Sequence, residues 1–314
     1  MTRQITNHIM MIRPVAFHMN EQTAVNNYYQ KNEKGADQQA IQKEALAQFD
    51  AFVEKLKAEG VDATVFEDTP EPATPDSIFP NNWISFHEDG KVRLYPMYAA
   101  NRRSERREDI LEGLKEKFEV KEVLSYTDWE NQNAYLEGTG SLLLDRQNKI
   151  AYAAISERTM AEVLDAFCKE VGYEKVAFHA NQTVDGKRLP IYHTNVMMCL
   201  GEGFSVVCLE SIDDSKERDN LISSLEKTGK EIIEISESQK EHFAGNMLQV
   251  LGKNERLVVM SEAAFQSLSE YQKARLSGHG KLVYSDIHTI EKLGGGSARC
   301  MMAEIFLSEK KANA

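Results

Sequence analysis

The chain alternates between stretches of helical periodicity and short apolar runs. Five stretches repeat apolar residues every three or four positions, as amphipathic helices do: 40–59, 104–118, 156–171, 214–227 and 261–276. Each is followed closely by a run typical of a β-strand: 61–66, 120–124, 175–178, 231–235 and 281–284. Ser104, Ser156 and Ser261, each followed by Glu, suit helix starts. The pattern predicts five helix–strand units.

Further apolar runs extend each unit at its beginning. One run precedes each predicted helix: 9–12, 92–95, 150–154, 204–209 and 256–260. Before four of these lies another, at 83–86, 141–144, 196–200 and 247–251, and residues 300–307 supply the strand missing from the first unit. The strands after the helices begin about 50 to 60 residues apart, which is a period of repeated architectures. The sequence therefore predicts an α/β fold of five ββαβ repeats with pseudo-fivefold symmetry.

The predicted repeats cover roughly residues 1–67, 81–125, 137–180, 193–236 and 246–290, and 300–307 close the first. We expect one catalytic domain over residues 1–314. Repetition around a ring brings equivalent strand ends to one centre, as in propellers. The turns before the equivalent strands are 80–82, 136–140, 192–195, 244–246 and 297–300, and all are polar or contain glycine.

These turns carry a thiol, an imidazole and a carboxylate. Cys300 follows the flexible Gly294–Gly296 segment, His193 lies in the third turn and Glu137 in the second. Taken singly, a cysteine is usually an inert small hydrophobe, and a histidine or glutamate in a turn is usually structural. Their joint occurrence at equivalent repeat positions favours catalysis, because a thiolate beside an imidazole is an activated nucleophile.

Composition narrows the function classes. The formal net charge is −12 and the pI is near 5.3, which argues against nucleic acid and anionic membranes as partners. No apolar run reaches the roughly 18 to 20 residues of a membrane span, and the start has no signal-peptide core. The four cysteines show no zinc spacing. We expect a cytoplasmic protein with reduced thiols, no metal and no cofactor.

The same residues resemble the superfamily of amidinotransferases, arginine deiminases and dimethylarginine dimethylaminohydrolases, the penteins. The resemblance covers nearly the whole chain, through Phe79-Pro80-Asn81-Asn82-Trp83, Leu136-Glu137-Gly138-Thr139-Gly140-Ser141, His193-Thr194-Asn195 and the Gly-rich segment before Cys300. It implies a five-bladed α/β propeller in which Cys300 attacks a guanidinium or ureido carbon. It further implies that His193 is the general acid/base and that Glu137 holds the substrate's nitrogen end.

Two departures from the family pattern concern the substrate. Arginine-directed members usually have Asp in place of Asn82, and deiminases also have Asp in place of Asn195. An amide can donate to a neutral ureido carbonyl, whereas a carboxylate suits a cationic guanidinium. The branch most resembled is the citrulline-utilising hydrolases, which release ornithine, ammonia and carbon dioxide. Arginine or methylarginine hydrolysis, amidino transfer and a non-catalytic binding protein remain alternatives.

Other side chains complete the predicted site. Arg102 and Arg103 resemble the family's Arg-Arg turn and are candidates for binding the substrate carboxylate, with Arg13 and Arg299 as weaker choices; a solvated charge run is the plainer explanation. Asn81 and Asn246 are further candidates, as are Phe79 and Trp83, although aromatic residues in such turns often only pack. Residues 19–37 read as an exposed loop, with a lid as the alternative. A homo-oligomer is left open.

Overall fold

The computed structural model describes residues 2–31, 35 and 37–310. The helices within these ranges are α1 (Glu21–Ala24), α2 (Gln38–Ala58), α3 (Glu108–Lys117), α4 (Gly138–Ser141), α5 (Ala161–Val171), α6 (Thr194–Met197), α7 (Ser215–Lys227), α8 (Glu237–Glu241), α9 (Glu262–Ser267), α10 (Glu270–Ser277) and α11 (His288–Gly294). None of them combines the length and the apolar composition that a membrane span requires.

The strands form small mixed sheets that repeat one pattern. Five described sheets have three strands each. In each, the middle strand pairs antiparallel with one neighbour and parallel with the other, which follows it in the chain after a helical segment. Their orders are β17 (Ala303–Glu304), β1 (His8–Arg13), β2 (Asp62–Glu67); β3 (Ile84–Phe86), β4 (Lys91–Leu94), β5 (Glu122–Ser125); β6 (Leu143–Asp145), β7 (Ile150–Ala154), β8 (Glu174–Phe178); β11 (Met198–Leu200), β12 (Phe204–Val207), β13 (Glu231–Glu234); and β14 (Leu248–Leu251), β15 (Arg256–Ser261), β16 (Lys281–Ser285).

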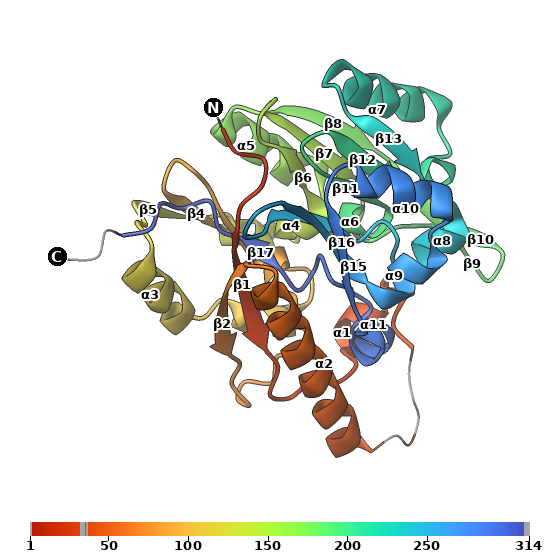
Figure 1. Cartoon of the computed structure of the whole chain (residues 1–314). Coiled ribbons are helices and arrows are strands. Elements are labelled where there is room, and N and C mark those ends of the chain that lie inside the picture. Colours follow the sequence, from red (N-terminus) through yellow and green to blue (C-terminus); the bar gives the residue numbers. More distant parts are fainter. Residues whose placement is uncertain (1, 32–34, 36, 311–314) are drawn as a thin grey trace.

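The mixed α/β fold and the ββαβ order agree with the sequence prediction. The last strand, β17, pairs with β1 through Ile9 with Glu304 and Met10 with Ala303, so the end of the chain completes the first sheet. The helices α2, α3, α5, α7 and α10 lie outside the strands (Figure 1). The sheets in the described part of the chain are separate and do not join into one closed sheet.

Several local expectations were wrong. The fifth helical stretch is two helices, α9 and α10, because Leu268 between them is extended and Ser269 caps a new helix. Ser261 does cap α9, but α3 and α5 begin later than Ser104 and Ser156. Ser156 Oγ instead donates to the carbonyl of Tyr192, 2.8 Å away.

A hairpin and a short helix were not predicted. The hairpin is β9 (Asn181–Val184) with β10 (Lys187–Pro190), and it leads directly into the turn that carries His193. The helix is α11, which ends at Gly295 in the left-handed conformation with φ +65°. Cys300 follows in a turn rather than in the strand, which is limited to Ala303–Glu304. The nucleophile candidate is therefore held by a helix end and a turn.

We call β17, β3, β6, β11 and β14 the inner strands of the five sheets. The turns before β3, β6 and β11 pass extremely close to one another. A Cβ added to Gly138, which has φ +47°, would lie 2.3 Å from the carbonyl oxygen of Asn81. A Cβ on Gly140 would lie 2.4 Å from Asn82 Nδ2 and 2.8 Å from His193 Nδ1. Glycine is required here because no other residue permits this backbone approach. The second turn is thereby packed against the first and the third.

We predict that Gly138→Ala destabilises the protein by about 2 to 4 kcal/mol, because it adds a backbone clash to the cost of positive φ. Gly172→Ala is the matched control, since Gly172 has φ +70° but open space around it. It should lose only about 1 to 2 kcal/mol. Urea unfolding followed by the fluorescence of the buried Trp83 measures both. Equal losses in the two variants would contradict the close-packing argument.

Candidate active site

Three of the predicted turns line one small cavity. Its walls are Asn27, Asp76, Phe79, Asn82, Arg102, Arg158, Tyr192, His193, Gly294, Gly295, Gly296 and Cys300. The volume is about 10 Å³, which is room for about one water molecule. The structure therefore brings together Cys300, His193 and Asn82, which lie far apart in the sequence, in a closed site.

Two amides surround the sulfur of Cys300. Asn195 Nδ2 and Asn246 Nδ2 each donate to Sγ over 3.3 Å, and Asn246 Nδ2 also donates to the carbonyl of Asn195 over 2.8 Å. Behind the cysteine, Met301 and Met302 belong to an apolar cluster, so the turn is fixed from that side. Two N–H donors are suited to a sulfur that carries negative charge.

The other three cysteines have different surroundings. Burial raises the pKa of Cys168 to about 11 and that of Cys199 to about 12, and it also raises the pKa of Cys208. None of the three lines the cavity that contains Cys300. Their raised pKa values keep these thiols protonated near neutral pH.

His193 and Glu137 form a buried pair. His193 Nε2 lies 2.7 Å from Glu137 Oε2, and Glu137 Oε1 accepts from the backbone N–H of Tyr98 at 2.9 Å. Burial alone would raise the pKa of Glu137, but Arg158, the bond to His193 and Arg102 together lower it to about 2. Burial lowers the pKa of His193 to about 4, against the opposing effect of Glu137. At neutral pH the pair is thus a carboxylate and a neutral imidazole.

The guanidinium of Arg102 is fully engaged in the cavity wall. It forms two hydrogen bonds with Glu105, of 2.8 and 2.9 Å, and donates to Asn82 Oδ1 at 2.8 Å and to the carbonyls of Asp76 and Phe79. Arg102 therefore organises the first turn. Arg103 lies outside the cavity, where it contacts Glu130 and the carbonyl of Met97.

The remaining predicted residues divide between the site and the framework. Phe79 lines the cavity, and Asn81 Nδ2 donates to Thr139 Oγ1 at 3.3 Å beneath it. Trp83 is fully buried in an apolar cluster and does not line the cavity. Arg13 pairs with Asp50 at the surface, and Arg299 pairs with Glu304.

Sequence reasoning missed Arg158 and Asp76. Arg158 is 2% exposed, its guanidinium carbon lies 4.9 Å from the ring centre of Tyr192, and its NH1 lies 3.7 Å from Glu137 Oε2. Asp76 is also buried, and its Oδ1 has no hydrogen-bond partner among the described residues. Arg158 fell inside a predicted helix and Asp76 in a loop without periodicity, so the sequence carried no signal for either.

Residues 19–31 cover the cavity, contrary to the expected exposed loop. Asn20 Nδ2 and Thr23 Oγ1 donate to Asp76 Oδ2 at 2.8 and 3.0 Å, and Asn27 Nδ2 donates to the carbonyl of Gly295 at 3.3 Å. The segment includes α1, which lies beside α11 (Figure 1). Residues 32–34 and 36 of the predicted loop lie outside the described residues. We name residues 19–31 the covering segment.

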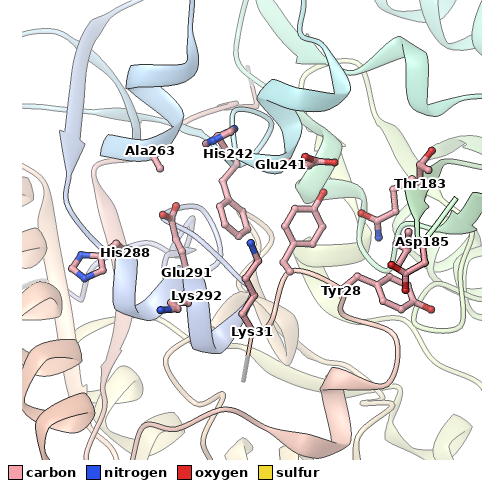
Figure 2. Close-up of a pocket in the computed structure, with 14 residues that line it drawn as sticks. Tyr28, Lys31, Thr183, Asp185, Glu241, His242, Ala263, His288, Glu291 and Lys292 are labelled. Carbon is pink, nitrogen blue, oxygen red and sulfur yellow. The ribbon is translucent and has the colours of Figure 1, made fainter. Parts of the chain in front are cut away.

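A larger cavity lies on another side of the covering segment. It has a volume of about 590 Å³ and is bounded by Tyr28, Tyr29 and Lys31 of that segment, the β9–β10 turn, α8, α9 and α11 (Figure 2). Glu291, whose pKa burial raises to about 7, lines it and accepts from Ser297 Oγ at 2.5 Å. None of the predicted catalytic residues lines this cavity.

One group of side chains in the described chain has the composition of a metal site. His8, Asp62 and Glu309 lie together, but Asp62 is 3.1 Å from Nδ1 of the imidazole and Glu309 is 3.7 Å from Nε2. Lys117 Nζ also lies 2.7 Å from Asp62. The carboxylates face opposite ring nitrogens, so the group is a charge network rather than a coordination site.

Comparisons with known proteins bear on the family and the fold. The model of the family described as N,N dimethylarginine dimethylhydrolase, eukaryotic, matches residues 13–307. No curated protein matches the chain.

Solved structures share the fold at low sequence identity. The chain is similar to ArgZ, an arginine dihydrolase of cyanobacteria, with a TM-score of 0.72 and 19% identity over 98% of this chain and 41% of that one. The substrate-bound N-terminal domain of ArgZ matches with the same score and identity over 96% of this chain and 99% of the domain. The chain thus spans less than half of full-length ArgZ.

A dimethylarginine dimethylaminohydrolase variant, solved as an adduct with S-methyl-L-thiocitrulline, gives a TM-score of 0.63 at 18% identity, over 96% of this chain and 100% of that one. At these identities the solved structures establish the fold alone, whereas the family model covers nearly the whole sequence. The chain therefore belongs to the N,N-dimethylarginine dimethylhydrolase family of the pentein superfamily.

Proposed function

We propose that the protein is a cysteine-dependent hydrolase that converts citrulline to ornithine, ammonia and carbon dioxide. Family membership supports the broader activity, hydrolysis at an arginine-related guanidino or ureido group. The observation that carries the narrower proposal is the set of amides around the nucleophile. Asn195 and Asn246 donate to the sulfur, and Asn82 stands where arginine-directed relatives usually have a carboxylate.

We further propose that the five sheets are blades of a propeller in one domain. The contacts between the inner strands β17 and β3, β6 and β11, and β11 and β14 support this arrangement. This arrangement explains why the turns before these strands meet, although successive turns begin more than 50 residues apart in the sequence. The active site then lies where the blades converge.

Asn82 is oriented to donate a hydrogen bond. Its Oδ1 accepts from Arg102 at 2.8 Å, and its Nδ2, which lies beside Gly140, donates to Asn81 Oδ1 at 3.1 Å, so one N–H group of the amide remains for a ligand. An N–H donor matches the carbonyl oxygen of a ureido group and would oppose the N–H groups of a guanidinium. Developing negative charge on the ureido oxygen would be stabilised by this amide.

The first half of the reaction forms a carbamoyl-thioester. Neutral His193 accepts the thiol proton of Cys300, and the thiolate attacks the ureido carbon. The resulting imidazolium, stabilised by Glu137, protonates the departing amine, and the C–N bond breaks. If ammonia leaves first, the carbonyl carbon remains bonded to sulfur and to the ornithine nitrogen.

The second half of the reaction consumes one water. His193, neutral again, takes a proton from water, the hydroxide attacks the thioester carbon, and the C–S bond breaks. The carbamate that is released decomposes to carbon dioxide and the second amine. The balance is one citrulline and one water to one ornithine, one ammonia and one carbon dioxide.

Arg158 is a better candidate for the substrate carboxylate than Arg102 or Arg103. In the closed site it donates to the carbonyl of Thr23 at 2.8 Å and to Asn26, both in the covering segment. A cavity of about 10 Å³ cannot contain an amino acid, so this segment moves when substrate enters. Its movement would release the planar fork of Arg158 for a carboxylate, and the free Oδ1 of Asp76 would accept from the ammonium group.

Arginine or methylarginine hydrolysis is the second candidate function. The family model is that of a dimethylarginine hydrolase, and the fold neighbour ArgZ is an arginine dihydrolase. Asp76 Oδ1 and Asn195 Oδ1, both buried without a partner in the described chain, could accept from guanidinium N–H groups. Amidino transfer and a purely binding role are further outcomes that substrate assays distinguish.

We predict that citrulline is turned over at a higher kcat/KM than arginine or methylarginines when each is supplied separately. Ornithine and ammonia release measure the activity. Cys300→Ser should reduce kcat at least about a thousandfold, as loss of a nucleophile does, while Cys168→Ser retains activity. Arginine turnover without citrulline turnover would reject the substrate assignment, and activity in Cys300→Ser would reject the nucleophile.

Asn82→Asp should lower kcat/KM for citrulline at least about tenfold, because the variant loses the N–H donor that faces the ureido oxygen. The melting temperature should change little, since Arg102 can pair with the new carboxylate. Asn220→Asp, which changes an exposed amide on α7, is the control. Unchanged citrulline kinetics in Asn82→Asp would show that the amide does not set the substrate preference.

The pKa shifts predict acid sensitivity. His193 has a pKa of about 4 in the fold against 6.5 for the free side chain, so the unfolded chain binds more protons and stability falls as pH drops from 6.5 to 4. His193→Asn should flatten this fall by on the order of 2 to 3 kcal/mol. Urea unfolding at each pH measures it, with His179→Asn, an exposed histidine, as control. If the free energy of unfolding of His193→Asn falls with decreasing pH as steeply as that of the wild type, the lowered pKa of His193 is not the cause of the acid sensitivity.

A further inference from the structure

A second charged cavity lies at the opposite ends of two strands that serve the active site. Asn82 and Glu137 come before β3 and β6, whereas His87 and Arg146 come directly after them. The cavity has a volume of about 230 Å³. It is lined by Thr2, His87, Glu88, Asp89, Lys91, Arg93, Arg146, Glu170, Val171 and Tyr173.

Arg146 is a buried cation that forms no close ion pair, although the charge of Glu304, which pairs with Arg299, acts on it from farther away. It is 4% exposed, and no carboxylate of the described chain lies within 4.0 Å of its guanidinium. Its side chain donates to His87 Nδ1 at 3.4 Å, and its guanidinium carbon lies 4.0 Å from the ring centre of Phe306. A buried unpaired charge costs several kcal/mol unless a ligand or ion compensates it.

Arg93 adds a second unused donor. It is 2% exposed, and its Nε and NH2 bind the carboxylate of Glu170 at 2.9 and 3.1 Å. Its NH1 is buried and has no hydrogen-bond partner among the described residues. Arg93 therefore lines the same cavity as Arg146 and has one N–H group that is not engaged in a hydrogen bond.

The other charged groups around the cavity already have partners. Glu88 accepts from Arg3 at 2.9 Å, Glu170 accepts from Arg93 and from Tyr126 Oη, and Asp89 lies 3.5 Å from Arg93. Lys91 lies 3.4 Å from Glu122 and 3.7 Å from Glu170.

His87 adds no charge of either sign. Its Nδ1 must be the acceptor, since arginine can only donate. Burial, followed by the charges of Arg146 and Arg93, holds the pKa of His87 well below its usual value. None of the described residues that line the cavity therefore forms a close ion pair with Arg146.

We propose that this cavity binds a small oxyanion, a phosphate or a carboxylate, between Arg146 and the free NH1 of Arg93. The planar fork of an arginine matches two oxygens of such an anion. The volume lies below the usual range for organic ligands of drug size, which favours an ion or a short dicarboxylate. The site is independent of the proposed citrulline reaction, because it occupies the other ends of β3 and β6.

Titration calorimetry of the full chain with inorganic phosphate, and separately with succinate, at constant ionic strength tests the proposal. The wild type should bind at least one of them saturably, and the two arms identify which anion class fits. Arg146→Gln should weaken that binding at least tenfold. Arg275→Gln is the matched control, since it removes a surface arginine paired with Glu231, and its affinity should be unchanged.

Thermal unfolding in phosphate and in chloride gives a second readout that a structural role would not move. Phosphate stabilises proteins generally, so part of the rise in melting temperature is common to all variants. Binding at the site should raise the melting temperature in phosphate beyond this common part. This extra rise should be present in the wild type and in Arg275→Gln and absent in Arg146→Gln.

If Arg146→Gln does not fold, Arg146→Lys replaces it, and its binding should also be weakened because the fork is lost. Three outcomes overturn the site. They are no saturable binding of either anion by the wild type, equal affinity in the Arg146 variants, or self-association in place of anion binding.

Discussion

The arrangement of the site depends on how closely the turns before the inner strands approach one another. Gly138 and Gly140 pass against Asn81, Asn82 and His193 at distances that exclude any side chain. Gly245 does the same beside Val196 and Met197. Because the backbones touch, side chains from repeats far apart in sequence meet within hydrogen-bond distance. The chemistry of the site is therefore a consequence of backbone packing.

Because the turns pack so closely, the charged side chains Glu137 and Arg102 are buried. Each is compensated by charged or polar groups within the site. Glu137 is fully buried but faces His193, Arg158 and a backbone N–H group, so it remains ionised. Arg102 is balanced by Glu105. The sulfur of Cys300 is surrounded by neutral amides instead of carboxylates. The site therefore combines a neutral imidazole, an ionised carboxylate and amide N–H donors.

Much of the framework could be predicted because it depends on local periodicity. The strands β7, β12 and β16 lie within one or two residues of the predicted runs, and α2 and α7 match their predicted helices closely. The equivalent repeat positions also singled out Cys300, His193 and Glu137; Cys300 and His193 line one cavity, and Glu137 pairs with His193. Arg158 could not be found, since a lone arginine in a polar stretch looks like any surface arginine. The covering segment was misjudged in a similar way. Its polar residues look like those of an exposed loop, but several of them bind buried polar groups.

The sequence by itself determined the order of strands and helices and the residue types present in each turn, because periodicity and glycine are local properties of the chain. Only the tertiary structure decided which polar groups are paired. It assigned Arg102 to Glu105, left Arg146 without a carboxylate in close ion-pair contact, and placed Asn27 of the covering segment in the cavity wall. The physical reason is that hydrogen bonds and charge compensation depend on distances between segments that no local pattern encodes.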